Sequence, residues 1–599
     1  MNVFRRSGIR LSAIAGLVFL MFGTAFPANA KITYHISLAD RTVHRFDVTM
    51  DINNPVTGTE VAMPAWNALY QVRDFAVRVR DVRLVPAYPI RKIDKQTWQI
   101  GDPMNPLAGN VPDDFEVHYT IEWNDLGPFN SQVDDRHAFL NLAEVLMYVP
   151  NRRPEATEVV FDDLPEGWKI ATELAAGPEA NSFAAPSYDA LVDAPVEMGN
   201  FREASFDVNG AHYRMTLDTT PIDSETLESN LRKIVRYETT LMGGAPFKEY
   251  LFIFHIGPYG DVGGGGMEHA NSTAIAVSSV PLATSIGAHE FFHVWNVKRI
   301  RPQTLEPVDY TKEEYTRALW FAEGVTNTYE SFTLVRTGIW SKDQFYQDLT
   351  DQITELQSRP ARLWQSAEES SLDAWFEKYD SYRAPDRSIS YYDKGQILGD
   401  LLDLSVREAT ENKKSLDDVL RLLNEEYAKK GKYYNDSEGI EGAVEQVAGK
   451  SYADFFRKYV SGTEEIPYND YFTFAGLSLN VDRQISPDIG FMPARVPGGK
   501  QFTVATLEHG GPAEAAGLRV GDEILTLNGE AFPHNLRAWL REQPAGAAVT
   551  LHISRGMAEM DIQFKMSSHE EDRYSLAEDG HASELQKRIR EGFLKGTTD

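Results

Sequence analysis

Residues 286–295 read Ile-Gly-Ala-His-Glu-Phe-Phe-His-Val-Trp. The apolar residues around the two histidines predict a buried helix. On a helix His289 and His293 lie on one face because they are four residues apart, so both imidazoles can bind one metal ion. Glu290 then lies beside that ion and can reach a water molecule bound to it, whose pKa a zinc ion lowers toward ~7. Taken alone, the stretch also fits two ordinary histidines of a helix.

A second segment supplies a candidate third ligand, which a catalytic zinc site needs together with one open position. We predict a helix over residues 311–336, and it carries Trp-Phe-Ala-Glu-Gly at residues 320–324. An unpaired carboxylate in so apolar a turn is costly, and binding a cation removes the cost. Glu323 is therefore the candidate ligand; the alternative is a glutamate held by a salt bridge within the helix.

A glycine-rich run precedes the metal helix. Residues 263–272 read Gly-Gly-Gly-Gly-Met-Glu-His-Ala-Asn-Ser. Glycines allow the backbone to approach a bound molecule closely, and Glu268 adds a carboxylate that can bind the protonated α-amine of a peptide. The alternative is a flexible glycine-rich hairpin with no ligand.

Composition narrows the classes of function. The chain has 599 residues, a net charge of −29 and no cysteine. Disulfides, zinc fingers, iron–sulfur clusters, a cysteine nucleophile and a lipidated N-terminal cysteine are excluded, so His, Asp or Glu must hold any metal. The acidic balance argues against nucleic acid as a partner, and no Lys/Arg-rich run offers a local exception.

The first 30 residues are typical of a secretory signal peptide. Three arginines precede an apolar run at residues 11–26, and Ala28-Asn29-Ala30 offers small residues at the cleavage site. The alternative is an uncleaved anchor, but a membrane span needs ~20 apolar residues and this run is shorter. We expect cleavage after Ala30, no membrane attachment afterwards, and a bacterial periplasmic or secreted protein.

The spacing of apolar residues changes along the mature chain and marks several domains. We therefore predict a multidomain α+β protein. Residues 31–222 alternate apolar and polar residues, as in Phe115-Glu-Val117-His-Tyr119, and predict a β-sandwich-like N-terminal domain. Residues 223–470 predict a mainly helical domain with a small sheet at its start. Residues 471–566 return to strands, and residues 567–599 predict a charged, solvated tail with at most one amphipathic helix.

The last strand-rich region resembles a bacterial PDZ domain. Residues 510–529 read Gly-Gly-Pro-Ala-Glu-Ala-Ala-Gly-Leu-Arg-Val-Gly-Asp-Glu-Ile-Leu-Thr-Leu-Asn-Gly. PDZ domains bind a peptide by adding it as a strand to a sheet edge. Ile489, Gly490 and Phe491 form the candidate carboxylate-binding loop for a peptide or protein tail; the alternative is a domain that only packs on the enzyme.

These motifs together resemble the gluzincin clan of metallopeptidases, which have a thermolysin-like catalytic domain. Residues 265–269 are similar to the Gly-x-Met-Glu-Asn exopeptidase signature of zinc aminopeptidases in that clan, with His269 where the signature has Asn. Residues 289–302, together with a C-terminal PDZ domain, resemble the glycyl aminopeptidase family across the mature chain. The 29 residues between His293 and Glu323 fit this family better than the larger aminopeptidases.

The resemblance implies a role for each matching residue. One zinc ion per chain would be bound by His289, His293 and Glu323, with Glu290 as general base. Gly265, Gly266, Glu268 and His269 would line the substrate site, with Glu268 as the anchor of the amine. Tyr391-Tyr392-Asp-Lys-Gly resembles a Tyr-Glu-Lys-Gly segment whose tyrosine stabilises the oxyanion; Tyr392 matches it, and Tyr391 is the fallback.

The sequence leaves three hypotheses for the function of this protein. The first is a secreted zinc aminopeptidase that removes N-terminal residues from peptides, with a preference for glycine or alanine implied by the resemblance. The second is a zinc endopeptidase to which the PDZ domain presents protein tails. The third is a non-catalytic peptide-binding protein in which only the PDZ domain acts.

Overall fold

The computed structural model describes residues 32–56, 58–101, 114–125, 127–218, 222–257, 264–379, 381–495, 502–533 and 536–599. The expected signal peptide, residues 1–30, lies outside the described residues. Among the helices described, none combines the length and the apolar character that crossing a membrane requires.

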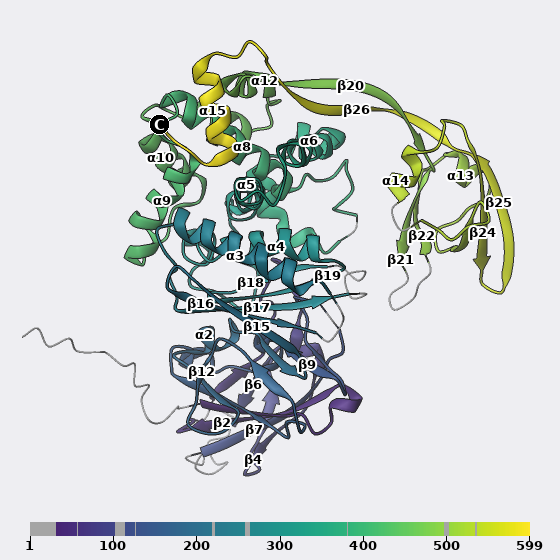
Figure 1. Cartoon of the computed structure of the whole chain (residues 1–599). Helices are drawn as coiled ribbons and strands as arrows, with labels where there is room; N and C mark the ends of the chain where they lie inside the picture. The colour runs from purple at the N-terminus through teal and green to yellow at the C-terminus, as the bar shows by residue number, and fades with distance from the viewer. Residues whose placement is uncertain are drawn as a thin grey trace, which may run out of the picture.

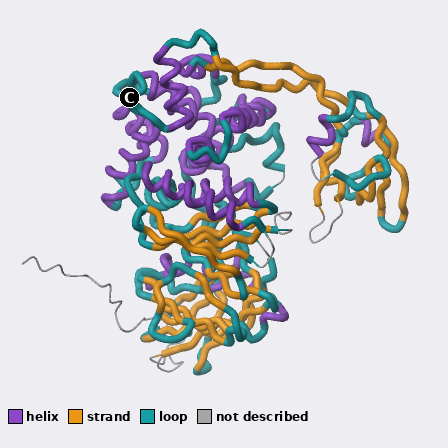
Figure 2. Tube along the Cα trace, viewed as in Figure 1, coloured by secondary structure: helices purple, strands orange, loops and turns teal. Residues whose placement is uncertain are grey.

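The N-terminal part of the chain is built from β-sheets, as the alternating pattern predicts (Figures 1 and 2). β2 (Arg45–Asn53) and β7 (Asp114–Glu122) pair antiparallel, and every second residue of each is buried. Their sheet has the order β12-β13-β10-β1-β2-β7-β4. The other five strands of this sheet are Ala175–Ala176, Ser182–Ala185, Thr157–Asp162, Ile32–Ser37 and Val79–Val85. Two smaller sheets complete this part, β11-β14-β9-β8 (Lys169–Ala171, Val196–Gly199, His137–Leu140, Gln132–Val133) and β3-β6-β5 (Glu60–Ala62, Thr97–Ile100, Ile90–Lys92).

A five-stranded sheet lies between the N-terminal sheets and the helices (Figure 1). Its order is β15-β16-β17-β19-β18, with bounds Arg202–Val208, Ala211–Leu217, Glu249–Ile256, Ser272–Val277 and Gly265–Glu268. One face packs under α3 (Ser224–Leu241) and α4 (Val280–Phe292), and the other packs on Phe139 of β9 through Leu251 and Ile253. β15 and β16 therefore belong to this sheet rather than to the N-terminal domain, where the sequence analysis puts them. Alternation alone does not reveal the parallel pairing of β16 with β17.

The middle of the chain is mainly helical, as predicted. Its longer helices are α5 (Thr326–Arg336), α6 (Lys342–Ser358), α8 (Tyr391–Ala409), α9 (Leu416–Glu426) and α10 (Asp436–Ala448). Residues 311–317 are not helical, which corrects the predicted helix over 311–336. The backbone N–H of Thr311 bonds to the Asp309 carboxylate at 2.9 Å, and that of Arg317 bonds to Asp436 at 3.1 Å. These side chains offer the backbone an alternative to helical hydrogen bonds.

The C-terminal strands form a PDZ-type sheet that stands apart from the helices in Figure 1. Its order is β21-β22-β23-β24-β25, with bounds Phe491–Arg495, Phe502–Leu507, Glu523–Leu527, Ala548–Arg555 and Ala558–Lys565. A two-stranded ribbon of β20 (Leu477–Asp488) and β26 (Ser567–Glu578) joins this sheet to the helical region. The sheet therefore starts at Phe491, later than the predicted domain boundary at residue 471.

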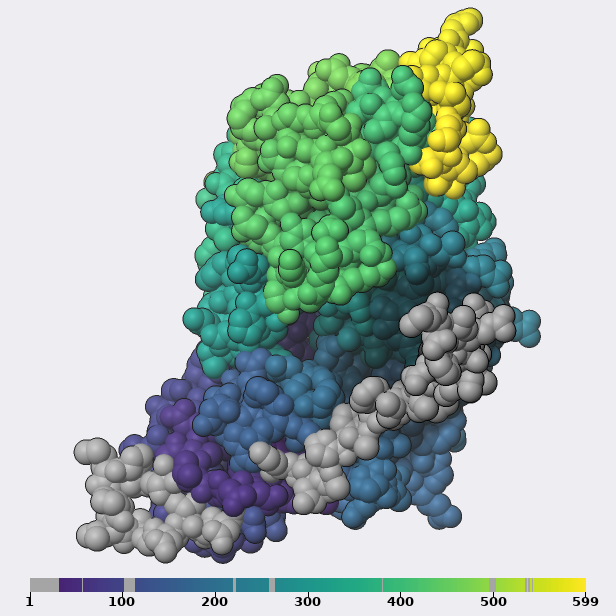
Figure 3. All heavy atoms as spheres, turned by 90° about the vertical axis from the view of Figure 1, so that its left-hand side faces the viewer, coloured from purple at the N-terminus to yellow at the C-terminus, as the bar shows by residue number. Residues whose placement is uncertain are grey.

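Residues 567–599 are not a solvated tail. After β26 the chain returns to the helical region as α15 (Glu584–Lys595), and Figure 3 shows this segment, in yellow, against the helices. Phe593 is fully buried and meets the ring of Phe332 at 5.3 Å. The structure thus contains the amphipathic helix that the sequence allows for, but this helix is docked on the helical region and is not part of a solvated tail.

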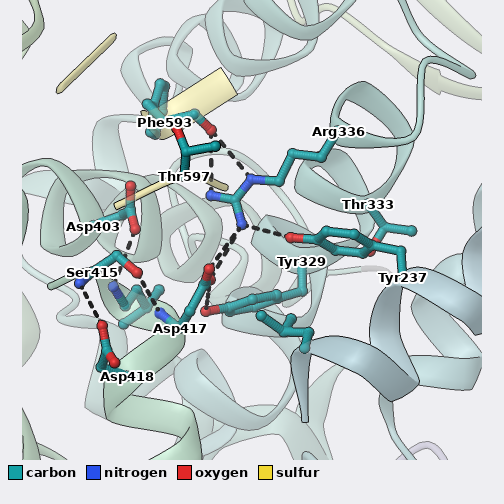
Figure 4. Close-up of polar contacts among 12 residues, drawn as sticks. Tyr237, Tyr329, Thr333, Arg336, Asp403, Ser415, Asp417, Asp418, Phe593 and Thr597 are labelled. Atoms are coloured by element: carbon teal, nitrogen blue, oxygen red, sulfur yellow. Dashed lines mark hydrogen bonds and ion pairs between the residues drawn. The ribbon is translucent and has the colours of Figure 1, made fainter. Parts of the chain in front are cut away.

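Buried arginines hold the end of the chain (Figure 4). Arg336 donates from Nε and Nη2 to the Phe593 carbonyl oxygen, at 3.3 Å each, and from Nη1 to Asp417 and Tyr237. Arg407 donates to the Thr597 carbonyl oxygen at 2.8 Å. The bonds from Arg336 satisfy a carbonyl group in the last turn of α15, and the bond from Arg407 holds the chain just beyond the helix.

Candidate metal centre and substrate site

The two histidines lie at the end of α4, where the chain leaves the helix. His289 is in the last turn and His293 is the C-cap residue. Their Nε2 atoms lie 3.0 Å apart, and Glu323 Oε2 lies 3.6 Å from His289 Nε2 and 3.3 Å from His293 Nε2. Ligand atoms around a tetrahedral ion with bonds of about 2.0–2.1 Å lie about 3.3 Å apart. The three residues therefore fit a zinc ion, with one coordination position left for water or substrate.

Glu323 reaches this position from a π-helix, η6 (Trp320–Val325). Single π-helical turns are rare and occur often at functional sites. The Asn296 side chain supports this turn, because its Nδ2 donates to the Phe321 carbonyl oxygen at 2.9 Å and to Thr326 Oγ1 at 3.1 Å. Asn296 lies three residues after His293, and nothing in the local sequence pattern indicates this supporting role.

The outer nitrogens of both imidazoles face acceptors. His293 Nδ1 lies 2.6 Å from the Asn296 carbonyl oxygen, and His289 Nδ1 lies 3.5 Å from Glu330 Oε2. Such acceptors direct the Nε2 atoms of ligating histidines toward the metal. Burial acts to raise the pKa of Glu323, but the charges and hydrogen bonds of the two histidines outweigh it and hold that pKa below its usual range. The carboxylate is therefore ionised, as a metal ligand must be.

Glu290 lies between the metal ligands and β18. Ligand atoms of Glu268, Glu290 and His293 all lie within 4.8 Å of one another. A Cβ atom at Gly266 would overlap the Glu290 carboxylate, so only glycine allows the strand to pass this close. Burial raises the pKa of Glu290 to about 8, and its Oε2 atom has no hydrogen-bond partner in the described structure. This free oxygen is available to a water molecule or a substrate.

Gly265 and His269 are the two remaining predicted substrate residues, and their surroundings differ. Gly265 lies beside Phe129 of the N-terminal domain. His269 is 1% exposed, and its Nδ1 faces Asp193 Oδ1 at 3.5 Å. Asp193 also accepts from Lys298 Nζ at 2.7 Å and from the Ala270 backbone N–H at 2.9 Å. The His269 side chain thus contacts the acid that fixes the end of β18.

Tyr392 lies in the first turn of α8, with its ring centroid 6.4 Å from that of His289. Its ring stacks on Tyr391 at 4.7 Å. Burial, and then the Glu323 carboxylate, raise the pKa of Tyr392 well above its usual value, so its hydroxyl stays protonated and can donate. Gly395 of α8 and Gly324 of η6 touch backbone to backbone, and this contact sets Tyr392 beside the metal ligands.

The candidate carboxylate-binding loop of the PDZ domain lies beside a groove that is separate from the metal site. Ile489 is buried, Gly490 has a φ of +73°, and Phe491 begins the edge strand β21. A groove of about 300 Å³ runs between β21 and α14 (Leu536–Arg541) and is lined by Phe491, Met492 and Leu540. An open strand edge beside a helix can take up an extended peptide.

Comparisons with known proteins give the same three parts in chain order. The family model described as M61 glycyl aminopeptidase matches residues 283–398, the Peptidase M61 N-terminal domain matches residues 33–200, and a PDZ domain matches residues 503–555. No curated protein matches the chain.

Two solved structures are similar to this chain to different degrees. An aminopeptidase N family protein from Idiomarina loihiensis is 25% identical, with a TM-score of 0.78 over 94% of this chain and 100% of that chain. An M1 zinc metallopeptidase from Deinococcus radiodurans is 15% identical, with a TM-score of 0.45 over 73% of this chain and 94% of that chain. The chain therefore carries an M61 N-terminal domain, an M61 glycyl aminopeptidase domain and a PDZ domain, and it is a zinc-dependent aminopeptidase.

Proposed function

We propose that this protein removes small N-terminal residues, glycine or alanine, from peptides in the periplasm or outside a bacterial cell, using one zinc ion per chain. The observation that carries the proposal is the distance of Glu268 from the metal cluster. Ligand atoms of Glu268 lie within 4.8 Å of those of Glu290 and His293. An α-ammonium group bound to Glu268 leaves room for one residue only before the carbonyl group that reacts.

His289, His293 and Glu323 would hold the zinc ion, which when bound lowers the pKa of water to ~7 and polarises a carbonyl group. Glu290 takes a proton from the attacking water and passes it to the leaving amine. Tyr392 donates a hydrogen bond to the carbonyl oxygen as negative charge develops there, which favours the transition state over the bound substrate.

The preference for small residues rests on the family description. The location rests on residues 1–30, whose sequence is typical of an exported protein.

The test compares alanyl p-nitroanilide with its N-acetyl derivative, with and without a chelator. We expect cleavage of the free amine only, loss on chelation, and recovery with zinc. In Glu268→Gln the kcat/KM for the free amine falls 10- to 100-fold or more, because one charge-assisted contact of about 1.5–3 kcal/mol is lost. Equal rates on blocked and free substrates would exclude an exopeptidase and favour the endopeptidase.

We also propose that the PDZ groove binds a peptide tail. Its edge strand β21 is open, and Figure 1 shows the sheet away from the helices, which supports binding over a packing role. Fluorescent peptides with free and amidated C-termini test this. Tighter binding of the free carboxylate supports a role for Ile489, Gly490 and Phe491, and equal binding contradicts it.

A further inference from the structure

The turn that follows Glu268, the proposed amine anchor, is bonded to side chains from two distant parts of the chain. Glu268 is the last residue of β18, the edge strand of the five-stranded sheet, and residues 269–271 lead back into β19. We call these three residues the anchor turn. An edge strand has a neighbouring strand on one side only, so contacts at the anchor turn help to fix where Glu268 lies.

Both polar backbone groups of Ala270, at the centre of the anchor turn, are bonded to charged side chains. Its N–H donates to Asp193 Oδ2 at 2.9 Å, and its carbonyl oxygen accepts from Arg299 Nη1 at 3.1 Å. Arg299 Nη2 also donates to Asn271 Oδ1 at 3.3 Å. Asp193 follows α2 (Tyr188–Val192) of the N-terminal part, 77 residues before Ala270. Two separate segments therefore hold this turn.

The basic side chains come from the segment that leaves the metal helix. The backbone N–H of Lys298 donates to the carbonyl oxygen of His293 at 3.0 Å, and Lys298 Nζ donates to Asp193 Oδ1 at 2.7 Å. Arg299 Nη1 donates to the Val294 carbonyl oxygen at 2.7 Å in addition to its bond to the anchor turn. A short path of hydrogen bonds thus runs from the metal ligand His293 through Lys298 and Asp193 to the anchor turn.

The Asp193 carboxylate is ionised in this arrangement. Burial acts to raise the pKa of Asp193, but the charge of Lys298 and the contact with His269 outweigh it and hold that pKa well below its usual range. Hydrogen bonds to an ionised group are about twice as strong as those between neutral groups. Both carboxylate oxygens already have partners, one in Lys298 and one in Ala270, so Asp193 acts on the turn and not on the amine itself.

We propose that Asp193 is a positioning residue for the amine anchor, and that with Lys298 and Arg299 it fixes the anchor turn relative to the metal ligands. The inference rests on the proposed function, in which Glu268 binds the α-ammonium group. A peptide held by its amine at Glu268 and by its carbonyl group at the metal ligands makes both contacts only when the two sites keep the right separation. A displacement of about 1 Å can lower a rate ~100-fold.

Two hydroxamates that differ only in the amine give the readout. Alanine hydroxamate can bind both the zinc ion and Glu268, whereas propionohydroxamic acid lacks the amine and can bind only the zinc ion. The ratio of their Kd values, measured by titration calorimetry on the zinc-loaded full chain, reports how well the amine is held. A general loss of stability does not change this ratio.

The variants are Asp193→Ala and Asp193→Asn, which keeps an oxygen for the Ala270 N–H but loses the ion pair. Glu203→Ala is the matched control, because it removes the 3.0 Å ion pair with Arg214 at the opposite edge of the same sheet. The side chains of that pair are 35% and 22% exposed, against 27% and 20% for Asp193 and Lys298. Glu268→Gln shows the ratio without the anchor charge.

We expect Asp193→Ala to lower the preference for alanine hydroxamate at least about 10-fold, toward the value in Glu268→Gln, because a charge-assisted contact of the amine is weakened. Asp193→Asn should fall by less, Glu203→Ala should keep the wild-type ratio, and the Kd of propionohydroxamic acid should stay unchanged in all of them.

A wild-type ratio in Asp193→Ala overturns the inference, as does equal weakening of both hydroxamates, since the damage then lies at the metal site. If Asp193→Ala does not fold, a wild-type ratio in Asp193→Asn overturns it instead. A wild-type ratio in Glu268→Gln has a different meaning, because it overturns the proposed function by showing that Glu268 does not bind the amine.

Discussion

The close contact between α8 and η6 gives the sharpest test of how the fold positions the site. A Cβ atom at Gly395 would overlap the Trp320 carbonyl oxygen and would lie 2.8 Å from Gly324 Cα. Ordinary contacts begin at 3.4 Å, so Gly395→Ala requires the two backbones to separate by well over 0.6 Å. The atoms that must move are backbone atoms of the π-helix that carries Glu323 and of the helix that carries Tyr392.

This displacement should affect activity more than folding. Overpacking costs about 1–3 kcal/mol of stability, whereas a shift of ~1 Å in a catalytic group can lower the rate 100-fold. We therefore expect Gly395→Ala to fold, to bind zinc more weakly, and to lose 10- to 100-fold in kcat/KM on alanyl p-nitroanilide. Zinc affinity is measured by competition with a chromogenic chelator.

Gly442→Ala is the matched control, because Gly442 is exposed in α10 and a Cβ atom there meets nothing within 4 Å. We expect this variant to gain about 1 kcal/mol of stability from helix propensity and to keep wild-type activity. Wild-type zinc affinity and kcat/KM in Gly395→Ala would refute the reasoning.

Three further predictions concern the catalytic base, the C-terminal helix and a buried charge. Glu290→Gln is expected to retain zinc but to lose turnover by several orders of magnitude, whereas His293→Ala is expected to lose both zinc and turnover. Elemental analysis measures the zinc content of each variant, and the aminoacyl amide assay measures its turnover. Near-normal activity of Glu290→Gln contradicts the proposed mechanism. Phe593→Ala removes a fully buried ring and should lower the free energy of unfolding by about 3–5 kcal/mol, measured by denaturant unfolding. The control Lys595→Ala, on the exposed face of the same helix, should leave this free energy unchanged. Equal denaturation midpoints of the two variants would mean that the helix is not docked. Burial lowers the pKa of Lys394 to about 8 from 10.5, so the unfolded chain binds its proton more tightly and wild-type stability rises with pH between 8 and 10.5. Replacing this lysine by Met should add about 3 kcal/mol at pH 7 and progressively less above pH 8; a gain independent of pH would exclude a buried charge as its cause.

Local patterns allowed much of the fold to be predicted. The alternation that begins at Phe115 predicts β7. The four-residue spacing of His289 and His293 indicates that their imidazoles share a face, because helix geometry alone determines this.

Other features depend on contacts that no local pattern contains. Asp436, more than a hundred residues away, helps to keep residues 311–317 out of a helix. Tyr70 meets Trp375 only because the N-terminal domain packs against the helical region, and nothing in the sequence around Tyr70 indicates that contact. The ribbon strand β26 is largely exposed on both faces, so it lacks the alternation by which strands are recognised.

The central claim is that His289, His293 and Glu323 bind one zinc ion. Diffraction data collected on either side of the zinc absorption edge, from crystals of the purified protein, test it most directly. We predict a single strong anomalous peak within about 2.0–2.2 Å of one atom from each of the three side chains. A zinc peak elsewhere in the chain, or none at this site in protein that cleaves alanyl p-nitroanilide, would contradict the claim.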